Sequence, residues 1–590
     1  MPGKRTIARL LVANRGEIAL RVMRTCREMG IEPVAVYGNG EESAPHVRYA
    51  DDAWRLRDSA GLPYLDIQGV VEAARAARVD AIHPGYGFLA ENAEFARALD
   101  VAGILFVGPS AEAIASMGDK VEARRIATAA GLRPVPGTTE PVRTVEEAIA
   151  AARATGYPVA VKAAGGGGGR GFRVARGEQD LAGAFHGSSG EAERYFSNPE
   201  VYLERYLEHP RHIEVQVMAD THGNVVALGE RDCSIQRRHQ KLVEETPSPA
   251  VAPDIRAKLL EASRDLARSV DYVGAGTVEY LLDASGDFYF LEMNTRIQVE
   301  HTITEMVTGI DLVREQIAVA TGEPLSVSEA DVFPRGWAIE CRINAEDAGR
   351  DFAPAPGRIG TYSEPGGFGV RVDGALGQGD EIQPRYDSLI AKLVAWGRSR
   401  EEAILRMTRA LGDFSIGGVP TTIPFHQRVM RHPEFRAGRA TTTFLVEYPE
   451  VLPSPAEPDR SPAFGEDADA MPLSLVVEVN GRRFETSVRG LPAGRAPGPE
   501  TKRKRTRRAG RADSGAAASG DDLVSPIHGT VIGINVAPGD QVEAGQVICV
   551  VEAMKMENEL AAHKAGTIAS MPLEPGASVS IGQVVATITS

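Results

Sequence analysis

The C-terminal fold is decided by GTVIGINVAPGDQVEAGQVICVV, residues 529–551, because much of this stretch returns as GTIASMPLEPGASVSIGQVVATI at residues 566–588. Each copy is predicted to form a strand, a Pro-Gly turn, a strand, a Gly turn and a strand. One copy is too short to bury a core, so the two should pack as a pseudo-symmetric β sandwich. The shared residues, each displaced by 37 positions, are Gly529, Pro538, Gly539, Val542, Gly545, Gln546 and Val547, which recur as Gly566, Pro575, Gly576, Val579, Gly582, Gln583 and Val584.

The segment between the two copies, Glu552–Glu557, reads EAMKME and is predicted to place Lys555 at an exposed hairpin tip. For an arbitrary protein, Met-Lys-Met is an ordinary surface turn. Here residues 524–588 resemble the biotinyl domain family, whose modified lysine stands in Ala-Met-Lys-Met between the halves of the repeat. The related lipoyl domains usually carry Asp-Lys-Ala at this turn. The resemblance therefore implies that biotin is attached covalently to Lys555 by a biotin protein ligase.

Composition excludes several classes of protein. A chain of 590 residues with 43% hydrophobic and 25% charged residues is expected to form several soluble domains. Its net charge of −15 argues against a nucleic-acid coat. No apolar run reaches the roughly 20 residues of a membrane span, and Leu10–Ala13 is too short for a signal peptide. The cysteines are scattered without a CxxC pair, which favours a cytoplasmic protein without disulfides or zinc: Cys26, Cys233, Cys341 and Cys549.

Up to about residue 448, strand-like runs alternate with amphipathic helix-like runs, which predicts an α/β architecture. Two linkers follow, a Pro- and Ala-rich stretch after Tyr448 and a second stretch from Leu491 to Asp521. Between them, Asn480-Gly481 separates two alternating apolar runs and predicts a β-hairpin at residues 473–488.

A glycine-rich loop is the first sign of phosphate chemistry. VAVK at residues 159–162 and FRV at residues 172–174 are strand-like runs, and between them stand Gly165, Gly166, Gly167, Gly168 and Gly169. Glycine N–H groups can turn toward an anion, and Lys162 adds a positive charge. The sequence lacks the Gly-Lys-Ser/Thr of a Walker loop and opens no helix, so a mobile lid over a nucleotide competes with a plain flexible linker.

Alternating polar residues give the metal signal. In FYFLEMNTRIQVE, residues 288–300, every second side chain from residue 292 is polar, so an extended chain would place them on one face. The set comprises Glu292, Asn294, Arg296, Gln298 and Glu300, with Glu279 shortly upstream. An exposed strand would show the same alternation, but carboxylate and amide oxygens in this number favour Mg²⁺ bound to ATP phosphates.

Residues 7–448 resemble the biotin carboxylase family of ATP-grasp enzymes. The resemblance is carried by ANRGEIA (13–19), IHPGYGFL (82–89), MGDK (117–120), Lys162 with the glycine loop, PRHIE (210–214), ERDCS (230–234), QRRHQK (236–241), residues 292–301 and ECRINAE (340–346). It implies a Rossmann-like N-terminal part (1–118), an ATP-grasp domain with a mobile lid (119–330) and a C-terminal α+β part (331–450). Linkers with a small β docking patch near 473–488 occupy 451–521, and an all-β biotinyl (lipoyl-like) domain occupies 522–590.

The family implies roles for individual residues. Lys120, Lys162 and Gly165–Gly169 would bind ATP phosphates, and the other ATP-binding residues would be Glu204, Leu207, His212, Gln236, His239 and Leu281. Glu279, Glu292 and Asn294 would bind Mg²⁺ or Mn²⁺. Lys241, Arg296, Gln298 and Val299 would surround bicarbonate, Glu300 would deprotonate it, and Arg342 would stabilise the biotin enolate. Arg205, beside Glu204, stands where many relatives carry Lys.

The two resemblances imply one activity: ATP- and bicarbonate-dependent carboxylation of biotin on Lys555. Carboxybiotin would then serve a separate carboxyltransferase β subunit in a hetero-oligomer that carboxylates acetyl-CoA or propionyl-CoA. The alternatives are a methylcrotonyl-CoA-type subunit, a non-biotin ATP-grasp ligase, a carrier without activity, and a single-chain pyruvate or urea carboxylase, for which no length remains. The basic run Lys502–Arg508 allows nucleic-acid binding, but its place in a linker of an acidic protein disfavours that function. The hairpin patch is predicted to dock the partner subunit.

The Ala-Met-Lys-Met motif yields the first prediction. Protein made in biotin-fed cells should carry one biotin per chain, because Lys555 stands at the position that the biotinyl family modifies. Intact-mass measurement should detect the added mass, and Lys555→Ala should lose it. A biotin remaining on that variant would refute the assignment.

Overall fold

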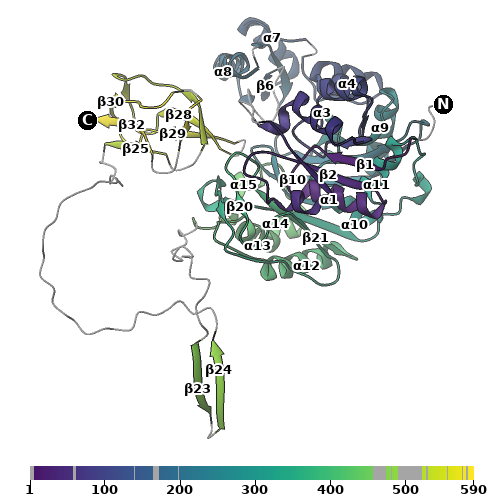
Figure 1. Ribbon diagram of the computed structural model, residues 1–590. Coiled ribbons are helices and arrows are strands. Elements are labelled where there is room, and N and C mark those ends of the chain that lie inside the picture. Colours follow the sequence, from purple (N-terminus) through teal and green to yellow (C-terminus); the bar gives the residue numbers. More distant parts are fainter. Residues whose placement is uncertain are drawn as a thin grey trace, which may run out of the picture. The chain divides into compact units, whose positions relative to one another are not determined.

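The computed structural model describes residues 5–57, 62–138, 140–163, 172–196, 198–455, 473–479, 482–488, 521–525, 529–553, 556–574, 576–579 and 583–589. The chain divides into two compact units, Met1–Ala456 and Glu457–Ser590 (Figure 1). The glycine loop at 165–169 and Lys555 lie outside the described residues, so their predicted roles stay predictions.

The first unit begins with a five-stranded parallel sheet of order β3-β2-β1-β4-β5. Its strands are β1 (Arg9–Val12), β2 (Glu32–Tyr37), β3 (Asp52–Arg55), β4 (Ala81–His83) and β5 (Leu105–Phe106). Neighbouring residues of β1 enter different cores, Leu10 beside α1 (Gly16–Glu28) and Leu11 beside α3 (Ile67–Ala76) and α4 (Ala93–Ala102). Helices therefore cover both faces of the sheet, which confirms the Rossmann-like N-terminal part.

A small antiparallel sheet of order β7-β6-β8 follows. Its strands are β6 (Val159–Ala163), β7 (Phe172–Ala175) and β8 (Val201–Arg205), and helices α7 (Val145–Thr155) and α8 (Glu178–Phe196) supply its core. Lys162 of β6 lies opposite Phe172 of β7. The glycine stretch therefore joins two paired strands, as the sequence predicts.

The large sheet has eight antiparallel strands in the order β13-β12-β9-β10-β11-β14-β21-β19. Because β11 pairs with β14, one sheet runs from the ATP-grasp region into the C-terminal region. The strands are β9 (Arg211–Ala219), β10 (Val225–Arg237), β11 (Gln240–Thr246), β12 (Gly274–Leu282), β13 (Phe288–Asn294), β14 (Trp337–Asn344), β19 (Val370–Gly374) and β21 (Leu389–Gly397).

Helices that pack on this sheet include α5 (Ala111–Gly118), α6 (Lys120–Ala129), α9 (Pro253–Ser269), α10 (His301–Thr308), α11 (Leu312–Ala320) and α12 (Arg400–Asp413). The first unit also contains α2 (Pro45–Tyr49), α13 (Ile423–Arg431), α14 (Pro433–Arg436) and α15 (Phe444–Glu447). Short strands complete it: β15 (Glu346–Asp347), β16 (Ala353–Pro354), β17 (Gly357–Arg358), β18 (Thr361–Ser363), β20 (Glu381–Ile382) and β22 (Ser415–Gly417).

The second unit contains the predicted sandwich, as two four-stranded sheets of order β25-β32-β30-β27 and β29-β28-β26-β31. The short strand of each repeat pairs with the first strand of the other, β27 with β30 and β31 with β26, so neither repeat forms its sheet alone. The strands are β25 (Asp522–Val524), β26 (Gly529–Ile534), β27 (Gln541–Val542), β28 (Val547–Ala553), β29 (Met556–Ala561), β30 (Gly566–Ser570), β31 (Ser578–Val579) and β32 (Val584–Thr589).

Turn glycines explain why the repeat preserves its Pro-Gly pair. Gly539 and Gly576, the glycines of the two Pro-Gly turns, have φ of +100° and +91°. A side chain would be strained in this backbone conformation, so both copies need glycine there.

Two further strands of the same unit, β23 (Leu473–Val479) and β24 (Arg482–Val488), form an antiparallel hairpin with Val479 opposite Arg482. The hairpin that Asn480-Gly481 predicts is therefore confirmed, and its docking role stays a prediction.

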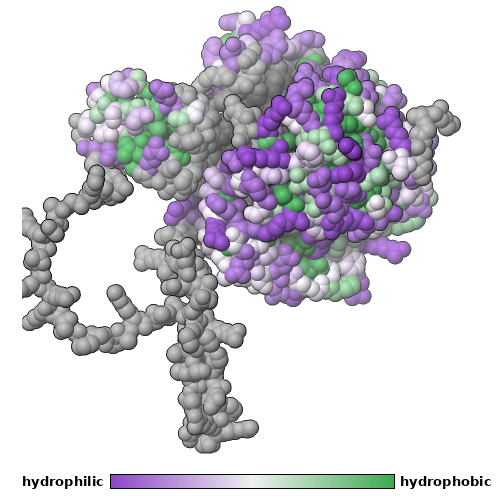
Figure 2. Space-filling model, in the orientation of Figure 1, coloured by the Kyte–Doolittle hydropathy of each residue, from purple (hydrophilic) through white to green (hydrophobic). Residues whose placement is uncertain are grey.

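The surface and the cysteines of the described residues agree with the composition of the chain. In Figure 2, small groups of hydrophobic residues lie between hydrophilic ones on the face shown. Among the described residues, no helix is both long and apolar enough to cross a membrane. All four cysteines are buried and free: Cys26, Cys233, Cys341 and Cys549.

Candidate active site

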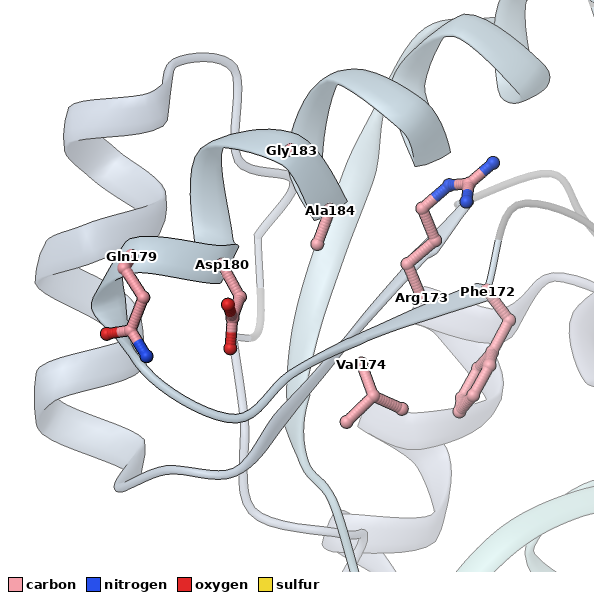
Figure 3. Close-up of a pocket in the computed structure, with 7 residues that line it drawn as sticks. All are labelled: Phe172, Arg173, Val174, Gln179, Asp180, Gly183 and Ala184. Carbon is pink, nitrogen blue, oxygen red and sulfur yellow. The ribbon is translucent and has the colours of Figure 1, made fainter. Parts of the chain in front are cut away.

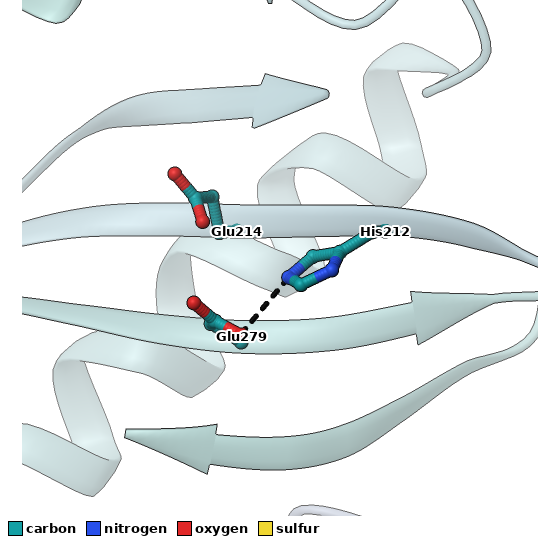
Figure 4. A group of neighbouring side chains, drawn as sticks. All are labelled: His212, Glu214 and Glu279. Atoms are coloured by element: carbon teal, nitrogen blue, oxygen red, sulfur yellow. Dashed lines mark ion pairs between the residues drawn. The ribbon is translucent and has the colours of Figure 1, made fainter. Parts of the chain in front are cut away.

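A row of carboxylates crosses three neighbouring strands of the large sheet. Glu279 of β12 lies directly opposite Glu214 of β9 on one side and Glu292 of β13 on the other. The alternation of each strand explains the row: on β9, Ile213 and Val215 enter the core beneath α9, while the polar side chains face the other way. Figure 4 shows His212, Glu214 and Glu279 gathered on adjacent strands, with His212 Nε2 3.0 Å from Glu279 Oε2.

Lys241 of β11 is the centre of the cluster. Its buried ammonium donates to Glu214, to Glu279 Oε1 at 2.9 Å and to Glu300 Oε1 at 2.7 Å. Burial by itself would lower the pKa of Lys241, but the carboxylates outweigh it and raise that pKa well above its ordinary value. Lys241 is therefore a fixed positive charge at neutral pH.

Glu300 is correspondingly a fixed anion. Burial alone would raise the pKa of this carboxyl, but Lys241, Arg342 and Arg231 together hold that pKa well below its usual range. Arg342 Nη2 donates to Glu300 Oε2 at 3.0 Å, and Arg342 Nε donates to Glu244 Oε1 at 2.6 Å. A buried carboxylate that stays ionised between two cations can accept a proton from a substrate bound beside it.

The expected straight strand from residue 292 to residue 300 is wrong, because β13 ends at Asn294. Beyond Asn294 the chain leaves the sheet and is bound by Glu91. The Glu91 carboxylate accepts from the Thr295 backbone N–H at 3.0 Å and from Arg296 Nε at 2.7 Å. The polar side chains nevertheless converge, since Asn294 and Gln298 both donate to Glu279 Oε1, at 2.9 and 2.8 Å. The convergence comes from a turn rather than from a shared strand face.

Arg231 of β10 is a second centre, and the sequence patterns gave it no role. Its side chain is 0% exposed. It donates to Glu214, to Gln298 Oε1 at 2.8 Å, and to Gln216, Thr277 and Thr304. Arg231 lies within ERDCS, but only the tertiary structure shows that its buried guanidinium pairs with Glu214 of the carboxylate row.

Glu279 and Glu292 fit a divalent cation. Burial, together with the neighbouring charge of Glu279, raises the pKa of Glu292. Like charges directly opposite each other across two strands repel, and Mg²⁺ between their oxygens would relieve that repulsion. Two other sets of side chains in the described part of the chain have metal-ligand spacing, but Lys241 already binds carboxylates in both: His212, Glu214 and Glu279, and Glu214, Cys233 and Glu300.

The predicted phosphate-binding lysines approach this site from two elements. Lys120 is the first residue of α6. Burial lowers the pKa of its ammonium, and the charge of Glu292 opposes that shift in part. Lys162 of β6 pairs with Glu204 of β8, to which Arg124 of α6 also donates. Positive charges therefore lie at the carboxylate row and at the small β7-β6-β8 sheet (the lid sheet), as a polyphosphate that bridges the two places would require.

An apolar cluster lies beside this end of the site. Val135, Leu207 and Tyr289 are buried together, with Leu281 packed against them. Arg124, the partner of Glu204, also donates to the Val135 carbonyl at 2.8 Å, which links the cluster to Glu204. A flat aromatic base would pack well against such apolar side chains.

The remaining predicted residues lie around the same centre. Gln236 of β10 pairs in register with Lys241, and the Val299 carbonyl accepts from Lys392 Nζ at 3.2 Å. His239 has its pKa lowered by burial and by the charge of Lys162. Phe172, which the sequence patterns did not single out, lies with its ring 5.6 Å from that of His239.

A surface hollow of about 610 Å³ lies on the lid sheet, away from the carboxylate row. β7 and α8 line it, and in Figure 3 the Arg173 side chain of β7 points toward α8, whereas the Phe172 ring points to the other side of the strand. It adds no acid, base or metal-ligand cluster to the site. Its lining residues are Phe172, Arg173, Val174, Gln179, Asp180, Gly183 and Ala184.

Four known families match successive parts of the chain. Residues 6–114 match "Biotin carboxylase, N-terminal domain", residues 119–328 match "Carbamoyl-phosphate synthase L chain, ATP binding domain", and residues 340–447 match "Biotin carboxylase C-terminal domain". Residues 521–588 match "Biotin-requiring enzyme".

Individual proteins resemble the chain over different lengths. Biotin carboxylase 1 of Bacillus subtilis is 52% identical over 75% of this chain and 99% of its own length. The 2-oxoglutarate carboxylase small subunit of Hydrogenobacter thermophilus is 48% identical over 75% of this chain and 94% of its own. The biotin-dependent acyl-coenzyme A carboxylase alpha3 subunit of Mycobacterium leprae is 45% identical over 95% of this chain and 94% of its own.

Among solved structures, the biotin carboxylase domain of Hydrogenobacter thermophilus 2-oxoglutarate carboxylase, in complex with MgADP, ADP and bicarbonate, superposes with a TM-score of 0.74. It is 47% identical and covers 77% of this chain and 100% of its own.

The buried charge network yields a stability prediction. Arg231→Met should lower the free energy of unfolding of the first unit by about 3–5 kcal/mol, because Glu214 would lose one buried cation. Urea unfolding followed by tryptophan fluorescence measures the loss. Arg153→Met, which breaks the exposed pair with Glu178, is the control and should leave the unfolding midpoint nearly unchanged. An Arg231→Met protein as stable as wild type would contradict the role given to Arg231.

Proposed function

Because the chain belongs to the biotin carboxylase family and carries a biotinyl domain, we propose that it carboxylates biotin on its own Lys555 and supplies the carboxyl group to a separate acyl-CoA carboxyltransferase. The chain is a biotin carboxylase, an ATP-grasp ligase that uses ATP, bicarbonate, Mg²⁺ and biotin. The observation that carries the proposal is the anionic Glu300 held between Lys241 and Arg342.

The first step we assign to Glu300 is removal of the bicarbonate proton. Lys241 and Arg342 keep this carboxyl ionised, so a carboxylate rather than a carboxylic acid meets the substrate. Bicarbonate is a poor nucleophile until it loses that proton. Lys241, Arg296 and Gln298 lie around the same place, which supports their assignment as the residues that orient the anion.

The second step is attack by the deprotonated substrate on the γ-phosphorus of ATP. A new P–O bond forms while the bond to the leaving ADP breaks, and negative charge grows on the phosphoryl oxygens. Lys120 and Lys162 would offset that charge, and Mg²⁺ held by Glu279 and Glu292 would supply further neutralisation. Carboxyphosphate, the product, would hydrolyse in open water, which gives the lid sheet the task of excluding water.

The third step transfers the carboxyl group from carboxyphosphate to biotin: the C–O bond to phosphate breaks, a C–N bond forms, and the phosphate leaves with the proton of the accepting nitrogen. Biotin, when attached, supplies the nitrogen that accepts this group and the arm that carries it away. We assign Arg342 to the negative charge that develops on the acceptor, because Glu244 and Glu300 fix its guanidinium at the edge of the cluster.

These assignments predict two classes of variant. Glu292→Gln and Arg296→Ala should each lower bicarbonate-dependent ATP cleavage by about 10²-fold or more. The first variant removes a carboxylate assigned to Mg²⁺, and the second removes a positive charge assigned to bicarbonate. Arg342→Ala should instead slow carboxylation of free biotin more than ATP cleavage, since its charge is needed only at the acceptor. ADP release and labelled-bicarbonate incorporation measure the two rates.

The control for these variants is Asp287→Asn, at the exposed turn between β12 and β13, where Asp287 pairs with Arg133. This variant should keep ordinary turnover. Ordinary turnover in folded Glu292→Gln would show that the metal pair is misassigned.

An acyl-CoA is the acceptor that the similarities favour. The alignment with the acyl-coenzyme A carboxylase alpha3 subunit covers 95% of the chain, whereas the alignment with the 2-oxoglutarate carboxylase small subunit covers 75%. Membership of a 2-oxo acid carboxylase is therefore the second candidate, and a methylcrotonyl-CoA-type subunit remains a third. The relative aligned over 95% of this chain is named as an alpha3 subunit, which supports a partner subunit for the transfer step.

The division of labour gives a direct test. With ATP, Mg²⁺ and labelled bicarbonate, the purified chain should label its own Lys555-linked biotin but neither acetyl-CoA nor propionyl-CoA. Addition of a carboxyltransferase subunit should allow transfer to acyl-CoA, and deletion of residues 473–488 should abolish that transfer while sparing ATP cleavage with free biotin. Stoichiometric formation of malonyl- or methylmalonyl-CoA by the isolated chain would overturn the division.

A further inference from the structure

Two buried carboxyl groups near Arg342, to which the mechanism assigns no proton and no ligand, lie opposite each other on neighbouring strands. Glu244 of β11 and Glu340 of β14 are register partners in the antiparallel pairing, so their side chains project from the same face of the sheet. Both residues are 0% exposed. Two carboxylates cannot both stay ionised side by side without water unless cations balance them.

Each of these carboxyl groups has one oxygen without a partner in the described part of the chain. Arg342 Nε donates to Glu244 Oε1, but Glu244 Oε2 accepts from no donor. Thr302 of α10 donates to Glu340 Oε2, but Glu340 Oε1 accepts from no donor. Buried polar oxygens are rarely left in this state, and one proton between the two groups would satisfy both oxygens at once.

The surrounding charges favour the bound proton. Burial first, and then the neighbouring charge of Glu244, raises the pKa of Glu340 well above its ordinary value. Burial also raises the pKa of Glu244 to about 7, against the pull of Arg342. The titratable and charged groups that face the pair are Arg342 and Cys341 of β14, Lys241 of β11, Cys233 of β10, Lys392 of β21, and Glu300.

We propose that Glu244 and Glu340 share one proton across β11 and β14, and that this acid pair positions Arg342 for its charge-stabilising role. The inference rests on the proposed function of Arg342 and deepens it. Glu244 and Glu340 are positioning residues, since Glu244 contacts the guanidinium and Glu340 acts through Glu244.

The shared proton determines how many negatively charged groups already pair with Arg342. With it, the pair contributes one negative charge and Glu300 contributes a second. When Glu300 takes the proton of bicarbonate, Arg342 keeps only the single charge of the pair, and its guanidinium is free to attract the charge that develops on the acceptor. An unprotonated pair would leave two anions against Arg342 at that moment and would weaken this attraction.

Glu340→Gln is the decisive variant, because an amide N–H can donate to Glu244 as a protonated carboxyl does. The infrared difference spectrum between wild type and Glu340→Gln at neutral pH should show loss of a carboxylic-acid C=O band that shifts in D₂O. Loss of a carboxylate band without an acid band would overturn the proposal. This readout needs no catalysis, so it stands even where the proposed function fails.

Kinetics separate positioning from folding. Glu340→Gln should keep at least a third of the wild-type turnover with free biotin, whereas Glu340→Leu, which cannot donate, should lose at least tenfold. Glu244→Ala should lower biotin carboxylation at least tenfold more than bicarbonate-dependent ATP cleavage. Equal loss of both rates in Glu244→Ala, or equal damage by Gln and Leu at position 340, would refute the positioning role.

The matched control is Glu245→Gln. Glu245 is the neighbour of Glu244 on β11 and is also buried, but it binds Arg400 and Trp337 instead of Arg342. Its substitution should change stability without separating the two rates. A separation of the rates in Glu245→Gln as large as that in Glu244→Ala would show that any buried charge change on β11 has this effect, and would refute the specific link to Arg342.

Discussion

The ammonium of Lys241 among Glu214, Glu279 and Glu300 is the interaction on which the site depends. Taking several charges out of water is costly, and the cost is offset only when every charge finds an opposite partner in good geometry. Lys241 therefore ties β9, β11, β12 and the turn before α10 into one electrostatic unit. Removal of its charge would leave three buried anions held by the remaining cations alone.

The eight-stranded sheet is what makes such a cluster possible. Strand register sets neighbouring side chains about 5 Å apart, so Glu214, Glu279 and Glu292 are placed by backbone hydrogen bonds rather than by flexible loops. The pairing of β11 with β14 brings Arg342 into the same frame from a later part of the chain. A site assembled across several strands is rigid where charge must be balanced.

The sequence predicts those features that repeat or alternate along it. The 37-residue repeat predicts the sandwich, and the alternation from Glu292 to Glu300 predicts the convergence of polar side chains, although the chain reaches it by a turn at Thr295. Arg231 escapes prediction because nothing in ERDCS distinguishes a buried arginine from an exposed one. The facing of Glu244 and Glu340, 96 residues apart, depends on the register of two strands, which no local pattern encodes.

The proposed reaction places two requirements on the chain that a single rigid domain could not meet together, and the chain has two compact units. Phosphoryl transfer needs a dry, charge-balanced site, since water would hydrolyse the carboxylated phosphate. In the proposed function, the acceptor on Lys555 must also leave that site to serve a carboxyltransferase. Because the biotinyl sandwich has its own two cores and belongs to a separate compact unit, it needs no contact with the first unit to stay folded. In the proposed function, the covalent connection of the two units raises the effective concentration of the acceptor at the site.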